Sequence, residues 1–229
     1  RVRLIKNGKQ ITAHVPRIKG NRDSEENYQL LRGLGRQLGA RGWLYPTAPV
    51  DYGGSGMSGD WAVIIAQELD AYDLGLPPFP DPGGALAGQC IAVWGSDEQK
   101  RRILPRIIMG EAATWQLATD PAGGSDFAAT STTARRDGDQ YIINGVKTWV
   151  QGSYPAEYLW TIARTGPEEE RYQNLSWFMI PGQLPGIRVR PMEILQAENQ
   201  PGGRKNTVYL EDVRVSAADS ARAERMPRK

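Results

Sequence analysis

The sequence predicts an α+β protein: a helical N-terminal domain over residues 1–113, followed by an antiparallel, β-barrel-like middle domain over residues 114–229. From Asn27 to about Ala113, apolar residues recur at intervals of three and four, as in amphipathic helices. After Ala113 the period changes to two, and the strand candidates are short and separated by Gly, Pro and Asn. Short strands joined by such turns favour an antiparallel sheet or barrel over a parallel sheet.

Two helices stand out in the first half. In residues 60–73 (DWAVIIAQELDAYD), one apolar stripe is expected to face a core, and Ser58 or Asp60 can cap its start. The stripe consists of Trp61, Ile64, Ile65, Leu69 and Tyr72. In residues 96–110, Ser96 and Gln99 match a capping box, Gly110 supplies a stop, and Pro105 is expected to kink the helix because its ring removes a backbone donor.

The second half begins with a predicted hairpin. Residues 130–136 and 141–145 form its two arms, and Asp137-Gly138-Asp139 forms its turn. Further strands are predicted at YLWTIAR, SWFMIP, IRVRP and TVYLEDVRV. Clustered charge, Gly and Pro predict exposed loops over residues 166–174 and 197–206.

Composition excludes several classes of function. The chain has 229 residues, 40% of them hydrophobic and 24% charged, and its formal charge of +2 gives no strong field for nucleic acid or an anionic membrane. A single cysteine, Cys90, and a single histidine, His14, exclude an internal disulfide framework, a multi-cysteine zinc site and the usual histidine-bearing triads within the chain. No apolar run approaches the ~18 residues of a transmembrane helix, and the first residues lack the apolar stretch of a signal peptide. A cytoplasmic protein with no metal is therefore expected.

A glycine-rich stretch at residues 54–59 (GSGMSG) matches the dinucleotide-binding pattern and precedes a helix, with Asp73 at a tolerable distance for a ribose contact. That fingerprint requires a buried strand leading into the first glycine. The preceding residues, PTAPVDYG, contain two prolines and no strand-forming run. We therefore interpret the stretch as a loop that enters a helix.

The segment TDPAGGSD, residues 119–126, contains little side-chain bulk. Gly and Ala let a main chain approach a ligand closely, successive N–H groups can cradle anionic oxygens, and the Ser125 hydroxyl can donate to a phosphate or an acyl oxygen. Taken alone, the segment is better described as an ordinary turn rich in Gly and Asp than as a ligand loop.

Its neighbours favour a ligand loop. It follows WQLAT and precedes NGVKTWVQG, and this ordered set resembles the acyl-CoA dehydrogenase family, whose members carry T-E-P-x-x-G-S-D and then N-G-x-K-x-W-I-T. Residues 49–70 resemble the family's P-x-x-y-G-G-x-G helix entry, residues 96–111 its e-x-Q-K-x-x-x-L-P-x-x-x-x-G-E segment, and residues 209–219 its closing f-d-d-V-x-V-P strand. The resemblance covers roughly Leu34 to Asp219.

The resemblance implies FAD as cofactor, bound between the middle domain and the helices. It places Thr119 at the pyrimidine edge of the flavin, Gly124 and Ser125 beside the pyrophosphate and the entry of the thioester substrate, and Trp149 against the isoalloxazine ring. Main-chain contacts are implied for the neighbouring residues Gln116, Leu117, Ala118 and Val150.

The sequence departs from the family pattern at two positions. Gln151 stands where the family usually has a Thr whose hydroxyl reaches flavin N5, and Asp120 replaces the usual Glu, a milder change because both cap a turn. The charged residues Lys147, Asp126, Arg135 and Arg136 are predicted to be surface or hairpin charges, and Cys90 to be a small core residue.

The implied reaction is α,β-desaturation of an acyl-CoA thioester, with hydride transfer to flavin N5 and electrons passing to an electron-transfer flavoprotein. The family's catalytic carboxylate lies in a C-terminal helical domain that this chain is expected to lack, so no catalytic residue is assigned; each available Glu has a solvated or capping role. Three explanations fit such a chain: it is a fragment, a subunit that pairs with a second acyl-CoA dehydrogenase-like chain, or a degenerate binding homologue. If it does not pair with a second kind of chain, a homo-oligomer (tetramer or dimer) is the expected assembly. A flavin monooxygenase on the same fold, favoured by Gln151, and a non-catalytic homologue remain alternative functions.

Overall fold

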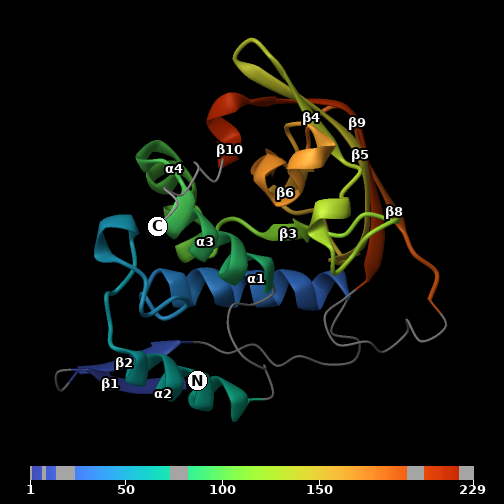
Figure 1. Cartoon of the computed structure of the whole chain (residues 1–229). Helices are drawn as coiled ribbons and strands as arrows, with labels where there is room; N and C mark the ends of the chain where they lie inside the picture. Colours follow the sequence, from blue (N-terminus) through green and yellow to red (C-terminus); the bar gives the residue numbers. More distant parts are fainter. Residues whose placement is uncertain (1, 7–8, 14–23, 73–81, 195–203, 222–229) are drawn as a thin grey trace. The chain divides into compact units, whose positions relative to one another are not determined.

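The computed structural model describes residues 2–6, 9–13, 24–72, 82–194 and 204–221 (Figure 1). The chain divides into two compact units. One unit contains residues 1–92 and 100–113, and the other contains residues 93–99 and 114–229. His14, Asp73, most of the predicted loop at 197–206 and residues 222–229 lie outside the described residues.

The first unit is mainly helical, as predicted. Its elements are a hairpin of β1 (Val2–Lys6) and β2 (Lys9–Ala13), then α1 (Glu25–Gly39), α2 (Gly59–Asp70), most of α3 (Pro82–Trp94) and most of α4 (Asp97–Ile108). The hairpin was not predicted. A loop, not a strand, leads into α2, so the glycine-rich stretch at 54–59 is confirmed as a loop that enters a helix.

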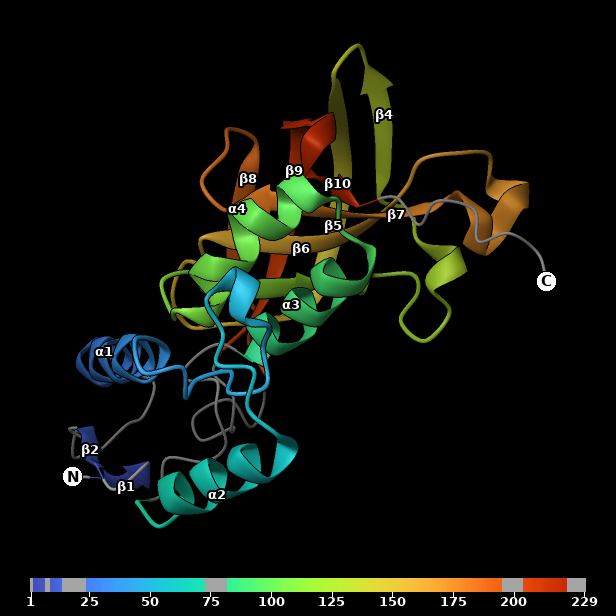
Figure 2. The ribbon, with the colours of Figure 1, turned by 90° about the vertical axis from the view of Figure 1, so that its left-hand side faces the viewer.

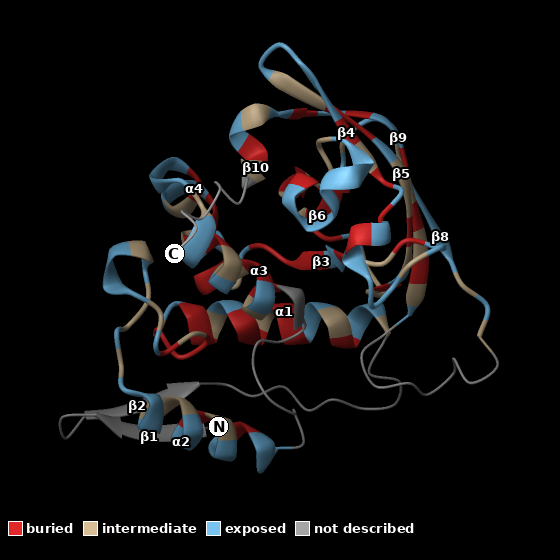
Figure 3. Cartoon of the chain, viewed as in Figure 1, coloured by how far each residue is buried: buried red, intermediate tan, exposed pale blue. Residues whose placement is uncertain are grey.

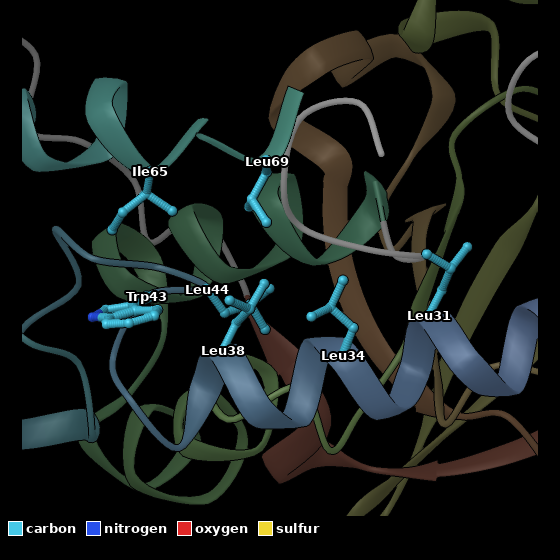
Figure 4. Packing of buried hydrophobic residues seen from close by; sticks show 7 residues of the cluster. All are labelled: Leu31, Leu34, Leu38, Trp43, Leu44, Ile65 and Leu69. Atoms are coloured by element: carbon cyan, nitrogen blue, oxygen red, sulfur yellow. The ribbon is translucent and has the colours of Figure 1, made fainter. Parts of the chain in front are cut away.

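The core of this unit lies between α1 and α2. Figure 4 shows Leu31, Leu34 and Leu38 of α1 pointing toward Ile65 and Leu69 of α2, with Trp43 and Leu44 beside them. The predicted stripe of α2 is therefore only partly correct, because Ile64 and Tyr72 are each 42% exposed. Ile64 is rotated about 100° from Ile65 around the helix axis, and Tyr72 lies beyond the last residue of α2.

Glycines allow α1 to approach the end of α4. A Cβ atom at Gly39 would lie 2.5 Å from the Met109 carbonyl carbon, and one at Gly110 would lie 2.8 Å from the Gly35 carbonyl carbon. Gly110 has a left-handed φ of 69°, so the predicted stop is confirmed. Helix α4 continues through Pro105 to its end.

The capping box at the start of α4 is also confirmed. The Ser96 N–H donates to Gln99 Oε1 at 3.0 Å, and the Gln99 N–H donates to Ser96 Oγ at 3.2 Å. This first turn belongs to the second unit, where the Gln99 side-chain amide also donates to the carbonyls of Ala218 and Ser220 at 2.8 and 2.9 Å.

The second unit is a curled sheet of eight strands: seven follow the order β10-β7-β6-β4-β5-β9-β8, and the eighth, β3, pairs with β6 (Figure 1). The strands are β3 (Thr114–Leu117), β4 (Thr133–Asp137), β5 (Gln140–Gln151), β6 (Tyr158–Arg164), β7 (Leu175–Pro181), β8 (Ile187–Pro191), β9 (Lys205–Ser216) and β10 (Ser220–Ala221). Most pairings are antiparallel, which confirms the predicted fold class, while β6 pairs in parallel with β3 and β4. The sheet is therefore mixed.

The predicted hairpin is β4 and β5, which projects beyond the rest of the sheet in both views (Figures 1 and 2). Its turn is Gly138-Asp139, because Asp137 already pairs with Gln140, and Gly138 supplies the left-handed φ of 65°. Three of the four residues of β3 are buried (Figure 3). The loop at 166–174 is mostly exposed, as predicted.

Candidate functional site

Two segments singled out in the sequence meet in the second unit. Ala118 and Thr119 follow the end of β3, and the Thr148 N–H of β5 donates to the Thr119 carbonyl at 2.8 Å. Since Trp149 follows Thr148 directly, the main chains of Thr119 and Trp149 lie close together. The two segments expected to share a ligand are thus neighbours.

Trp149 has an unusual backbone and an exposed side chain. Its φ is 59°, its side chain is 55% exposed, and the register between β5 and β9 shifts between Lys147 and Val150. A left-handed conformation costs an L-residue roughly 1–2 kcal/mol, and such strain concentrates at bulges that aim a side chain near a functional site. The fold therefore presents this indole outward at a cost in local energy.

The next two residues differ in what they can offer a ligand. Val150 is buried, and its carbonyl accepts a hydrogen bond from Asn206 Nδ2 at 3.1 Å. Gln151 is partly exposed, and its Oε1 accepts a hydrogen bond from Lys205 Nζ at 3.0 Å. Because Lys205 donates to the side-chain carbonyl of Gln151, the NH2 group of the same amide is left to donate to a ligand.

Residues at the end of β3 and just after it differ in exposure. Gln116 is exposed, Leu117 is fully buried, and Ala118 and Thr119 are partly exposed. The Leu117 side chain fills the core, so that residue could serve a ligand only through its main chain. The Thr119 side chain remains accessible.

The loop that follows is open at its tip. Gly124 and Ser125 are exposed. A Cβ atom at Gly124 would have Thr119 Cγ2, at 3.7 Å, as its nearest neighbour among the described residues, whereas one at Gly123 would lie only 3.2 Å from Ala129 Cβ. The described chain would tolerate a side chain at Gly124, and its absence leaves open space beside Thr119.

Lys147 is not the surface charge that the sequence predicts. Its side chain is fully buried and forms an ion pair with the equally buried Asp120 carboxylate. The prediction is wrong because strand alternation turns Lys147 into the core, where Asp120 Oδ1 and Thr130 Oγ1 accept from its ammonium group. Burial raises the pKa of Asp120, but the Lys147 charge and several hydrogen bonds outweigh this, so the pKa falls below its usual value. Burial lowers the pKa of Lys147 more than Asp120 raises it.

Asp126 is exposed, as predicted, but it is not isolated. Its carboxylate accepts from the Tyr172 hydroxyl at 2.9 Å, from Arg171 Nη2 at 3.1 Å and from the Ala128 N–H at 3.1 Å. The hydrogen bond from Tyr172, together with Arg171, lowers the pKa of Asp126. These contacts attach the loop to residues 168–174. Arg135 and Arg136 are exposed hairpin charges, as predicted.

A separate cavity of about 210 Å³ lies in the same unit and was not predicted. Its lining includes Trp115, Leu159 and Val189, with polar atoms from Arg204 and Asn206. These residues come from four strands and a loop end, so no local sequence pattern could have indicated the cavity. Among the described residues, no cluster of three or more His, Cys, Asp or Glu side chains could hold a metal ion. In the same part of the chain, no helix is both long and apolar enough to cross a membrane.

Both halves of the chain match known domain families. Residues 9–111 match the acyl-CoA dehydrogenase N-terminal domain, and residues 116–212 match the acyl-CoA dehydrogenase middle domain. The chain is 31% identical over 196 residues to acyl-CoA dehydrogenase IpdE1 and 32% identical over 184 residues to acyl-CoA dehydrogenase FadE29, both of Mycobacterium tuberculosis. These alignments cover 84% and 80% of this chain but 49% and 46% of the relatives. The chain thus spans about half the length of the curated relatives it matches.

Solved structures give the same result. The ChsE4-ChsE5 complex from Mycobacterium tuberculosis aligns with a TM-score of 0.71 at 30% identity, over 86% of this chain and 51% of that one. The Tcur3481-Tcur3483 steroid ACAD aligns with a TM-score of 0.72 at 30% identity, over 83% and 47%. A glutaryl-CoA dehydrogenase from Mycobacterium smegmatis, solved in complex with FADH2, aligns with a TM-score of 0.67 at 27% identity, over 85% and 49%.

Proposed function

Because this chain belongs to the acyl-CoA dehydrogenase family, whose members are FAD-dependent, we propose that it forms the flavin-binding part of an enzyme that introduces an α,β double bond into an acyl-CoA thioester. The observation that carries this proposal is the exposed indole of Trp149, held in a left-handed bulge that is hydrogen-bonded through Thr148 to Thr119. In this proposal the exposed Trp149 indole contacts one face of the flavin ring. The Thr119 hydroxyl lies at one edge of the ring, and Gly124 leaves room for it.

Individual residues then take the following proposed roles. The Trp149 indole packs against the ring, and the Thr119 hydroxyl donates to the pyrimidine edge, where negative charge increases on reduction. Gly124 keeps the approach open, and Ser125 donates to the pyrophosphate or to the substrate's acyl oxygen. The main chain of Gln116, Leu117, Ala118 and Val150 completes the binding surface.

Gln151 is proposed to replace the usual Thr as a donor toward the flavin. Lys205 holds the side-chain carbonyl, which leaves the NH2 group to donate. This arrangement supports a dehydrogenase even though the residue departs from the family pattern. When bound, FAD supplies the two-electron acceptor for the substrate's β-hydrogen. The base that removes the α-proton is assigned to no residue that the structure describes.

The assembly and the electron acceptor are also proposals. The ChsE4-ChsE5 and Tcur3481-Tcur3483 neighbours are each named as pairs of chains, which supports a heteromer with a second acyl-CoA dehydrogenase-like chain over a homo-oligomer. A steroid acyl-CoA is one candidate substrate because the second neighbour is named a steroid ACAD. An electron-transfer flavoprotein is the proposed acceptor.

Anaerobic reduction tests the function. The intact protein should bind added FAD, and an acyl-CoA should bleach the bound flavin without oxygen. Trp149→Ala should weaken FAD binding about tenfold, since an aromatic contact is worth about 0.5–1.5 kcal/mol beyond its buried area. Trp94→Ala, at an indole that is 48% exposed at the end of α3, is the matched control and should bind FAD as the parent does. Reduction only by an external reductase would favour the monooxygenase, and failure to bind FAD would favour a non-catalytic homologue.

A further inference from the structure

A buried ion pair, Asp120 and Lys147, lies next to the proposed flavin site without belonging to it. Both side chains are fully buried, and Lys147 is among the largest fully buried side chains of the described residues. The Lys147 ammonium donates to Asp120 Oδ1 and to Thr130 Oγ1, the latter at 3.2 Å.

The Asp120 carboxylate closes the loop that carries Gly124 and Ser125. Its Oδ2 accepts from the N–H groups of Ser131 and Thr132 at 2.7 Å each, and from their hydroxyls at 3.0 Å each. The main chain of Asp120 also exchanges two hydrogen bonds of 3.1 Å with Gly123. One carboxylate therefore joins the beginning of the loop to residues 131 and 132, which follow it.

Lys147 attaches this closed loop to the strand that carries Trp149. Lys147 pairs with Val208 of β9 and is the last residue of β5 before the register shift. The next residue is Thr148, whose N–H donates to the Thr119 carbonyl. The ion pair and this main-chain bond are two links between the same pair of segments. Together they fix where the loop lies relative to the bulge.

Stability alone does not account for such a pair. Removing two charges from water is costly, and well-packed apolar residues of similar volume are often as stable or more so. Buried polar groups are best attested as devices that fix a register. Here the register shift in β5 starts at the residue after Lys147.

We propose that the buried ion pair is a positioning element that holds the loop at residues 120–126 against the Trp149 bulge, so that Thr119, Ser125 and the indole form one binding surface. This inference rests on the proposed flavin site. It goes further by assigning a role to two residues that would touch neither cofactor nor substrate.

The double variant Asp120→Asn/Lys147→Met separates loop closure from the link to β5. The Asn oxygen can still accept from Ser131 and Thr132, and its NH2 group can donate to Thr130 once the ammonium is gone. Met retains most of the apolar stem of Lys147 and leaves no unpaired buried charge. The fold should survive, while the charged link is lost.

Two measurements on the intact protein decide the outcome. The dissociation constant for FAD should rise about tenfold, since a displacement near 1 Å of a binding group has effects of that order or larger. In the apoprotein, amide exchange over residues 148–151 should become about tenfold faster while the urea midpoint stays close to that of the parent. Parent-like FAD affinity and parent-like exchange would overturn the proposal.

Two further variants serve as a control and as a fallback for this test. Arg188→Met/Glu211→Gln removes an exposed ion pair between β8 and β9 and should change neither measurement. Thr130→Val keeps both buried charges and the side-chain shape but removes one acceptor from Lys147, so it serves if the double variant does not fold. It should raise the dissociation constant about threefold, and an unchanged value would count against the proposal. If the parent binds no FAD, the proposed function fails, and exchange in the apoprotein still decides the positioning role.

Discussion

Lys147→Met alone should destabilise the protein far more than replacement of an exposed lysine would. The substitution removes the ammonium group but leaves the Asp120 carboxylate buried without its counter-charge. Breaking a buried ion pair on one side costs about 3–5 kcal/mol, against a total stability of about 5–15 kcal/mol for a typical domain. We expect about 3 kcal/mol, since Ser131 and Thr132 still donate four hydrogen bonds to Asp120.

Urea unfolding of the intact protein at pH 7, followed by circular dichroism, measures this loss. The matched control is Arg188→Met, whose partner Glu211 is 64% exposed and keeps its hydration. An exposed pair of this kind contributes about 0–1 kcal/mol. A loss below about 1 kcal/mol for Lys147→Met, indistinguishable from the control, would refute the account of the buried pair.

Four further outcomes follow. The pKa of Asp120 is lowered in the folded protein, so ionised Asp120 stabilises the fold above its unfolded pKa of about 3.9. This stabilisation is lost as the pH falls through the folded pKa. The urea midpoint should therefore drop on acidification, and it should drop less in Asp120→Asn. Gly39→Ala should cost about 1–3 kcal/mol in thermal unfolding because its Cβ would meet the Met109 backbone at 2.5 Å, and an unchanged melting temperature would contradict that close approach. Gln99→Ala should cost about 1–2 kcal/mol by removing a cap and two side-chain bonds to carbonyls. Burial raises the pKa of the half-buried Cys90 thiol, so a thiol reagent should modify it more slowly at pH 8 than it modifies free cysteine.

Most of the fold could be predicted because it follows from local patterns. The strands at 158–164 and 187–191 have the bounds of the predicted segments YLWTIAR and IRVRP. The capping box at Ser96 and Gln99 forms the bonds that its spacing requires. The exposure of Ile64 could not be predicted, since the width of a buried stripe depends on what packs against it.

The site was predictable in its segments but not in its geometry. Local sequence cannot show that Lys147 is buried, because its partner lies 27 residues earlier and a lysine is exposed by default. Nor does residue type indicate the left-handed backbone of Trp149, since a bulky residue rarely adopts it. Both features arise only when β3 and β5 are brought together by the sheet.

The contacts of the Gln99 side-chain amide determine where a recombinant form of the β-sheet unit should begin. A recombinant piece that starts at Thr114 would contain every strand of the sheet, yet it would lack the donor that reaches the carbonyls of Ala218 and Ser220. The short strand β10, paired to β7 only at Ser220 and Ala221, would then have lost its outside support. Any excised version of the sheet should therefore start upstream of Ser96 and carry the opening turn of α4 with it.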